Sequence, residues 1–164
     1  MIQLFRTVRS SMVLMGLLLG TLSPITSAAD PFYLGKWKIV SAVVAPWWED
    51  RAHKPDDAEM RSLVGKTVTI TSKAIQGPKI LACTGTRYQV KDYPADFLFQ
   101  GAFGEMQRRD KSVDPVKVAA TVGFDGSSWK TLETGCDAEI DYHFIDPATA
   151  AIGLDNYVYT LKKQ

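Results

Sequence analysis

The chain has 164 residues, 46% of them hydrophobic, and its formal net charge at pH 7 is +1. This length has room for one domain. A nearly neutral chain has no general electrostatic attraction to nucleic acid or anionic lipid, so the composition excludes a protein that binds either by charge alone. The sequence shows no Gly-rich phosphate loop, no paired zinc cysteines and no basic–aromatic surface pattern. It therefore predicts no cofactor and no nucleic-acid partner.

Residues 1–29 have the pattern of an export signal. Arg6 and Arg9 precede an apolar run, Met12 to Leu22, which is too short to span a bilayer. Small residues come next, and we expect cleavage after Ala29. The sequence thus predicts a soluble periplasmic or secreted protein without a membrane span. Its mature chain, residues 30–164, is expected to form a single domain.

Residues 36–44 have the alternation of a strand with one buried face. Trp37 and Ile39 point one way, while Lys36 and Lys38 point the other. Pro46 ends this strand, because proline cannot donate a hydrogen bond to a β-ladder.

A short helix and further strands are expected next. Residues 56–59 form an acidic helix start, and Gly65 is placed to end the helix. The stretch 66–71 alternates as a strand with Val68 and Ile70 inward. After a turn at 76–78, one or two more strands lie within 79–90 and are interrupted at Gly85.

The middle of the chain has weaker signals. Residues 97–99 (Phe-Leu-Phe) form an apolar cluster too short for an independent helix, and the glycines at 101 and 104 loosen the segment after it. The basic cluster at 108–111 is interpreted as a solvated loop rather than an anion site. A second short helix is predicted over 114–121, with proline at its first position, and a strand over 129–132.

The last third of the chain predicts an antiparallel hairpin. Its first strand alternates apolar and polar residues: Ile140, Tyr142 and Phe144 against Glu139, Asp141 and His143. A turn is expected at 146–149, and the second run, 152–161, is rich in β-branched and aromatic residues. The polar residues are expected to face solvent.

The two cysteines, Cys83 and Cys136, are the even number expected of one disulfide in an exported chain. Their spacing is far from C-x-x-C, which disfavours redox catalysis. Two thiols alone do not close a zinc site. The sequence therefore predicts a structural disulfide.

Trp47 and Trp48 are a candidate contact site. Two adjacent tryptophans cannot both face the core of one strand, so one of them is expected at a rim or on the surface. The alternative is that both cover the open end of a barrel as packing.

The motif Gly35-Lys36-Trp37 resembles the opening of the lipocalins, a calycin family. This resemblance implies a mainly β fold, an antiparallel up-and-down barrel with one or two short helices, in which Trp37 plugs the closed end. It also implies that the final strand, through Tyr157 and Tyr159, pairs with the first, and that the interior holds one small apolar ligand. The chain is similar, too, to small uncharacterised exported proteins of Gram-negative bacteria that share its G-C and N-x-x-Y-T-L ending, a resemblance that supplies no activity.

The strongest catalytic-looking group is formed by Glu133, Glu139, Asp141 and His143. Residues 139, 141 and 143 project from one face of a strand at intervals of roughly 7 Å, so neighbours there can share a proton or a metal ion. We favour the simpler interpretation, the solvent-facing side of a hairpin. A metal site combining His53 with His143 has no recognisable ligand spacing.

Three functions are compatible with these patterns, in order of preference. The first is a binding protein for a small apolar or amphipathic ligand, with Trp47, Trp48, Tyr88 and Phe99 as contacts and no metal or catalytic residue. The second is a protein-interaction module, such as an inhibitor of a cell-envelope hydrolase, that presents the 47–50 loop or the 97–99 segment. The third is an enzyme built around His143.

Overall fold

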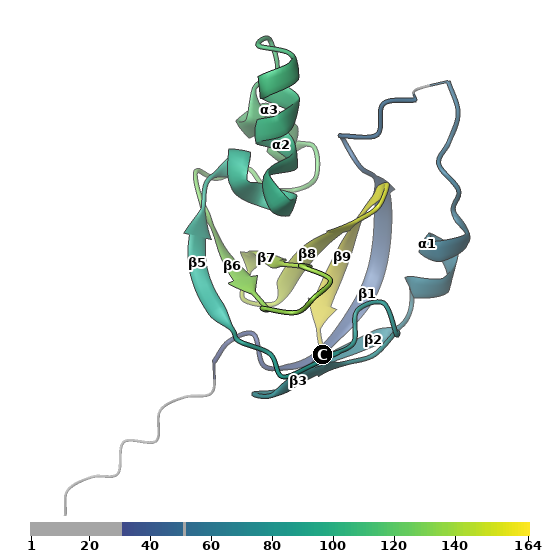
Figure 1. Cartoon of the computed structure of the whole chain (residues 1–164), viewed down its shortest axis with the longest axis vertical. Helices are drawn as coiled ribbons and strands as arrows, with labels where there is room; N and C mark the ends of the chain where they lie inside the picture. Colours follow the sequence, from purple (N-terminus) through teal and green to yellow (C-terminus); the bar gives the residue numbers. More distant parts are fainter. Residues whose placement is uncertain (1–30, 51) are drawn as a thin grey trace, which may run out of the picture.

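A computed structural model describes residues 31–50 and 52–164. The predicted export signal lies outside the described residues. Within them, nine strands form one antiparallel sheet in the order β4-β3-β2-β1-β9-β8-β7-β6-β5 (Figure 1). The strands are β1 (Gly35–Val44), β2 (Thr67–Ile70), β3 (Ala74–Gln76), β4 (Cys83–Thr84), β5 (Gln89–Tyr93), β6 (Trp129–Glu133), β7 (Tyr142–Asp146), β8 (Thr149–Leu154) and β9 (Tyr157–Lys163).

The first and last strands pair, as the sequence predicts. Ala42 lies opposite Tyr159, and Val44 lies opposite Tyr157, in an antiparallel β1–β9 ladder. The nine strands curl into a half-barrel (Figure 1). Its two free edges are β4 and β5, which are neighbours in the chain but not in the sheet. The mainly β, antiparallel fold is thus confirmed, with an opening between β4 and β5 that we call the seam.

The described residues contain three α-helices and one short 3-10 helix. The helices are α1 (Ala58–Leu63), α2 (Leu98–Arg109) and α3 (Pro115–Ala120), and the 3-10 helix is η1 (Ala95–Phe97). Helices α1 and α3 lie where the sequence predicts them. At the start of α3, an Asp114 carboxylate oxygen accepts the backbone N–H of Val116 at 3.0 Å. Helices α2 and α3 lie together on one side of the half-barrel, and α1 lies beside β1 (Figure 1).

Helix α2 corrects two expectations, that the apolar cluster at 97–99 is too short for a helix and that the basic cluster at 108–111 begins in a loop. Its first turn is irregular, because Phe99, Gln100 and Gly101 have φ values of 52°, 56° and 78°. A Cβ on Gly104 would lie 2.7 Å from the carbonyl oxygen of Asp96, so this glycine permits a close approach rather than breaking the helix. Packing stabilises α2 where local propensity does not, since its Leu98 and Phe103 are completely buried.

The last hairpin is also more elaborate than predicted. The run 152–161 is not one strand but parts of β8 and β9, joined by a turn in which Asp155 has a φ of 46°. Asn and Asp tolerate this left-handed region and so favour such turns. The extra reversal lets β8 pair with both β7 and β9.

Two hydrophobic cores occupy the two faces of the sheet. The first core, on the concave side, includes Trp37, Ile39, Val68, Leu132, Tyr142, Tyr159 and Leu161. The second core lies between the sheet and helices α2 and α3, and includes Leu98, Phe99, Phe103, Phe124, Trp129, Ala151 and Val158. Because side chains of both cores come from β8 and β9, most of these two strands is buried on both sides.

Candidate ligand-binding cleft

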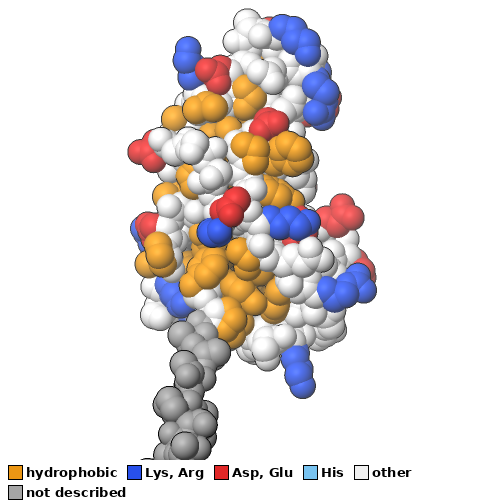
Figure 2. Space-filling model, turned by 90° about the vertical axis from the view of Figure 1, so that its left-hand side faces the viewer, with side chains coloured by type: hydrophobic (Ala, Val, Ile, Leu, Met, Phe, Trp, Pro, Cys, Tyr) orange, Lys and Arg blue, Asp and Glu red, His pale blue; other side chains and the backbone are white. Residues whose placement is uncertain are grey.

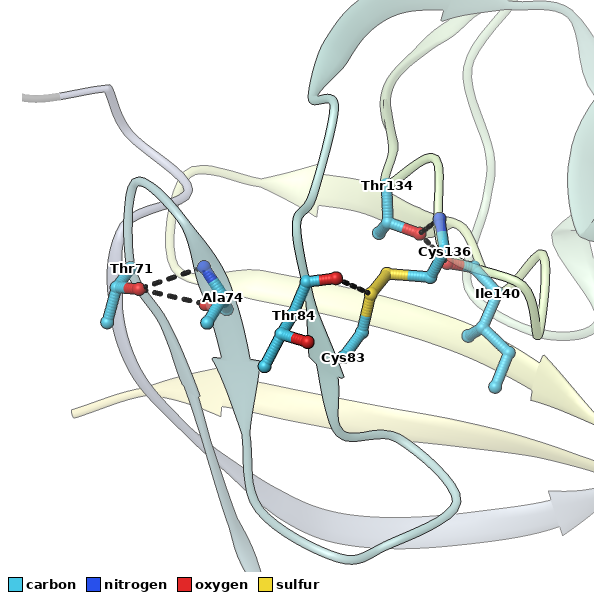
Figure 3. Close-up of a disulfide and its surroundings, with 7 residues drawn as sticks. All are labelled: Thr71, Ala74, Cys83, Thr84, Thr134, Cys136 and Ile140. Carbon is cyan, nitrogen blue, oxygen red and sulfur yellow. Dashed lines mark hydrogen bonds between the residues drawn. A yellow bond between two sulfur atoms is a disulfide. The ribbon is translucent and has the colours of Figure 1, made fainter.

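A disulfide bridges the seam. Cys83 of β4 is bonded to Cys136, which comes after β6, with their Cα atoms 6.1 Å apart (Figure 3). The predicted disulfide is therefore present. The bond ties the β3–β4 edge of the sheet to the loop that leads from β6 into β7.

Two threonines fix the backbone on either side of this bond (Figure 3). On one side, the Thr71 hydroxyl accepts the N–H of Ala74 at 3.1 Å and donates to its carbonyl oxygen at 3.0 Å. On the other, the Thr134 hydroxyl accepts the N–H of Cys136 at 3.3 Å and donates to the carbonyl oxygen of Ile140 at 3.2 Å. The walls of the seam are therefore ordered by local side-chain hydrogen bonds.

A cleft of about 480 Å³, which we call the seam cleft, opens beside the disulfide. Its apolar walls include Ile75, Leu81, Ile140 and Tyr142, which all belong to the first core. Ile80, also in the lining, is 42% exposed. Exposed polar residues complete the rim: Lys79, Thr84, Arg87 and Asp137. The seam cleft therefore joins a charged rim to the apolar interior of the fold.

The hydroxyl of Tyr142 has no hydrogen-bond partner among the described residues, whereas the nearby hydroxyls of Tyr88 and Thr86 interact with each other. Tyr142 is 1% exposed and lines the seam cleft. Burial raises the pKa of Tyr142, and the nearby Tyr88 raises it further. Burial likewise raises the pKa of Tyr88. Both phenols are thus neutral hydrogen-bonding groups at physiological pH.

The three predicted carboxylates, Glu133, Glu139 and Asp141, meet in a neighbouring cleft of about 610 Å³, which we call the acidic cleft. Glu133 accepts a hydrogen bond from the Tyr93 hydroxyl and lies 2.8 Å from Nζ of Lys91, and these contacts, Lys91 first, lower its pKa. Burial raises the pKa of Asp141 to about 6, and the charges of Glu133 and Glu139 add to this effect. Placing the Asp141 carboxylate beside those of Glu133 and Glu139 is therefore electrostatically unfavourable at neutral pH.

His143 does not join these carboxylates on a solvent-facing surface, so that expectation is wrong. Its side chain is 0% exposed and lies under α2. Nε2 accepts the N–H of Phe99 at 2.9 Å, and Nδ1 lies 2.8 Å from the Thr131 hydroxyl. Burial lowers the pKa of His143 to about 3. Solvent does not reach this imidazole, which gives it no access to a substrate proton.

The four predicted contact residues fall in three places. Tyr88 lies at the seam, where its ring centroid is 5.4 Å from that of Tyr33. Trp47 and Phe99 meet in the second core with centroids 5.4 Å apart, and Phe99 is 2% exposed. Trp48 donates from Nε1 to the carbonyl oxygen of His53 at 3.2 Å. The lining residues Ile80, Leu81 and Tyr142 were not predicted, although their proximity to the two cysteines was a usable signal.

The concave side of the half-barrel is filled by side chains. Trp37, the predicted plug, is 0% exposed and donates from Nε1 to the carbonyl oxygen of Tyr33 at 2.8 Å. Nζ of Lys163 lies 5.5 Å from the centroid of its ring. Ile39, Val68 and Leu132 are equally closed to solvent. Space for a ligand therefore lies at the seam and not among these residues.

A small groove of about 200 Å³ has Trp47, Trp48, Met106 and Val113 in its lining. Exposed apolar surface also occurs at two further places. One is a groove of about 410 Å³, the outer groove, lined by Val43, Val44, Pro46, Met106, Val118, Thr121 and Val122. The other is a groove of about 520 Å³ that includes Phe32, Trp129, Phe144 and Pro147. Figure 2 views the β5 side, where hydrophobic side chains gather next to the start of the described chain. Charges of both signs are interspersed over that face (Figure 2).

Neither a metal site nor a membrane-spanning helix is evident in the described part of the chain. No three His, Cys, Asp or Glu side chains within residues 31–50 and 52–164 are placed to hold a metal ion. No helix in the same residues has the length and hydrophobicity to cross a bilayer. Comparison of the chain with protein families, with curated proteins and with solved structures found no match. The resemblance to calycins thus stays a prediction.

Proposed function

We propose that this is an exported binding protein for a small amphipathic ligand, which it holds in the seam cleft. The observation that carries the proposal is a cleft at the opening of the sheet whose lining includes residues of the hydrophobic core, Leu81, Ile140 and Tyr142. These side chains are themselves buried, so a ligand entering at the seam would lie next to the core.

The dimensions and chemistry of the seam cleft suit such a ligand. Its volume of about 480 Å³ falls within the range of small-molecule sites, roughly 300–1,000 Å³. Most of the accessible lining is polar, and its apolar part includes the exposed Ile80, which gains from being covered. The charged rim keeps the entrance hydrated. The site thus combines a mainly polar lining with a small apolar surface, which suits a small amphipathic molecule.

Native mass spectrometry of protein purified from its own host tests this proposal. Ala82 is exposed and lines the seam cleft, so Ala82→Trp fills the cleft without disturbing the core. Ala120 is exposed on α3 and serves as the matched control, Ala120→Trp. We expect a co-purifying small molecule on the wild type and on the control, and none on Ala82→Trp. Bare protein in all three samples, or equal retention by all three, would contradict the proposal.

The second candidate is a protein-interaction module, and the outer groove favours it. Val43 and Val44 are 49% and 39% exposed on β1, next to Met106 of α2 and Val118 of α3. Exposed apolar surface rimmed by polar residues is typical of protein interfaces. Under this alternative, Val43→Lys abolishes capture of an envelope protein from periplasmic extract, whereas Ala82→Trp does not. If instead Ala82→Trp loses the co-purifying small molecule and Val43→Lys keeps it, the seam cleft is supported.

A further inference from the structure

We infer that the ligand of the seam cleft carries an uncharged hydrogen-bonding group, such as an alcohol or a primary amide, which binds the hydroxyl of Tyr142. This inference rests on the proposed function and specifies the chemical class of the ligand. It begins from a buried polar atom without a partner.

The hydroxyl of Tyr142 is the polar group that the fold leaves unsatisfied at the floor of the cleft. The residue is 1% exposed, and its oxygen forms no hydrogen bond with the described residues. Burying a polar group without a partner costs free energy, so native proteins almost always provide one. Such a group beside an opening of the sheet points to a partner that enters through that opening.

The chemistry of the floor favours a neutral partner. The buried side chains that line the seam cleft with Tyr142 are Ile75, Leu81, Thr134 and Ile140, and none of them is charged. A buried ion would lose its hydration without gaining an opposite charge. Lys79, Arg87 and Asp137 are exposed at the rim, where water screens them. A phenol both donates and accepts, which matches an alcohol or amide.

The edge of the sheet beside the cleft is able to move and admit this group. Strand β4 pairs only with β3 among the described strands, through Ala74 with Thr84 and Ile75 with Cys83. Strand β3 in turn pairs with β2 at two positions, Thr69 with Gln76 and Ile70 with Ile75. Short pairings open more readily than long ones, while the disulfide keeps the edge attached. Tyr142 lies on β7, which pairs on both sides and stays fixed.

A series of eight-carbon probes tests the inference by isothermal titration calorimetry: 1-octanol, octanamide, octanoate and octylammonium. We expect the two neutral probes to bind at least tenfold more tightly than the two ions. Tyr142→Phe removes only the hydroxyl, and we expect it to reduce the affinity for 1-octanol about tenfold. Tyr157→Phe is the matched control, because that hydroxyl contacts the carbonyl oxygen of Pro55 and does not line the cleft. It should leave the affinity unchanged.

Thermal unfolding of the unliganded variants supplies an independent readout. Since the Tyr142 hydroxyl has no partner without ligand, Tyr142→Phe should leave the melting temperature unchanged or raise it. A lower melting temperature would show that the hydroxyl is already engaged and would overturn the inference. Tighter binding of octanoate would assign the polar group to Arg87 or Lys79 and would also overturn it, while leaving the proposed function intact. Failure of all four probes to bind would count against the proposed function itself.

Discussion

Phe99 and His143 are joined by a buried hydrogen bond of 2.9 Å, from the backbone N–H of Phe99 to Nε2 of His143. Because Nε2 accepts, the ring proton is on Nδ1, which donates to the Thr131 hydroxyl at 2.8 Å. The neutral imidazole thus connects the irregular start of α2 to strands β6 and β7. It satisfies a backbone N–H that the left-handed conformation of Phe99, with φ of 52°, leaves outside the helical pattern.

His143→Ala should destabilise the protein by about 3–4 kcal/mol, because it creates a cavity and leaves the Phe99 N–H buried without an acceptor. Thr131→Val removes only the partner of Nδ1 and should cost about 1 kcal/mol. The free energy of unfolding in urea measures both. Equal effects of the two substitutions would show that the Phe99 bond contributes little.

Stability should fall as the pH decreases from 6.5 towards 3. Burial lowers the folded-state pKa of His143 from 6.5 to about 3, so the unfolded chain binds a proton that the folded chain does not. The associated loss reaches up to roughly 5 kcal/mol at the lower end of this interval. His143→Gln retains an acceptor and a donor but does not titrate, and should flatten this part of the curve. His53→Ala, at the exposed second histidine, should not.

Asp141→Asn should stabilise the protein, and it should do so at high pH rather than at low pH. The folded-state pKa of Asp141 is raised to about 6 by burial and by the charges of Glu133 and Glu139, so its ionised form destabilises the protein above that pH. Allowing for solvent screening of a partly exposed group, the amide should stabilise by about 1 kcal/mol at pH 8 and by almost nothing at pH 4. Thermal melts at the two pH values measure this. The exposed Asp125→Asn is the control, and a gain of the same size there would contradict the explanation.

Loss of the disulfide should be costly. Cys83 and Cys136 are 53 residues apart, and closing such a loop stabilises a fold by roughly 4 kcal/mol in the chain-entropy model. Denaturation of the Cys83→Ala/Cys136→Ala double variant should show a loss of this order. Wild-type protein treated with a reductant should reproduce it. An unchanged midpoint would mean that the β3–β4 edge is held by its other contacts.

Local patterns were enough to predict the strands and helices with clean periodicity or clear caps. Trp37 and Ile39 identify β1, Val68 and Ile70 identify β2, and Asp114-Pro115 marks the start of α3. The disulfide was predictable from the even number of cysteines, and the pairing of β1 with β9 was implied by the resemblance to the lipocalins. Strand β3 was not predicted, because three residues carry no measurable alternation. Strand β4 and the start of β5 fall within the predicted range 79–90, on either side of Gly85.

The environment of His143 could not be predicted from its own strand. Its alternation with Tyr142 and Phe144 indicates one buried and one exposed face, which holds only if nothing covers the outer face. Helix α2 covers it, and Gly101 and Gly104 conceal that helix from propensity arguments. The seam cleft was missed for a related reason: it arises from strands that fail to pair, a property of the whole sheet.

The central claim is that the seam cleft is the ligand site, and amide chemical-shift mapping with 1-octanol tests it most directly. The account predicts saturable shifts at Leu81, Ala82, Ala138 and Tyr142, and their loss in Ala82→Trp. Shifts centred on Val43, Val44 and Val118, or none that saturate, would contradict it.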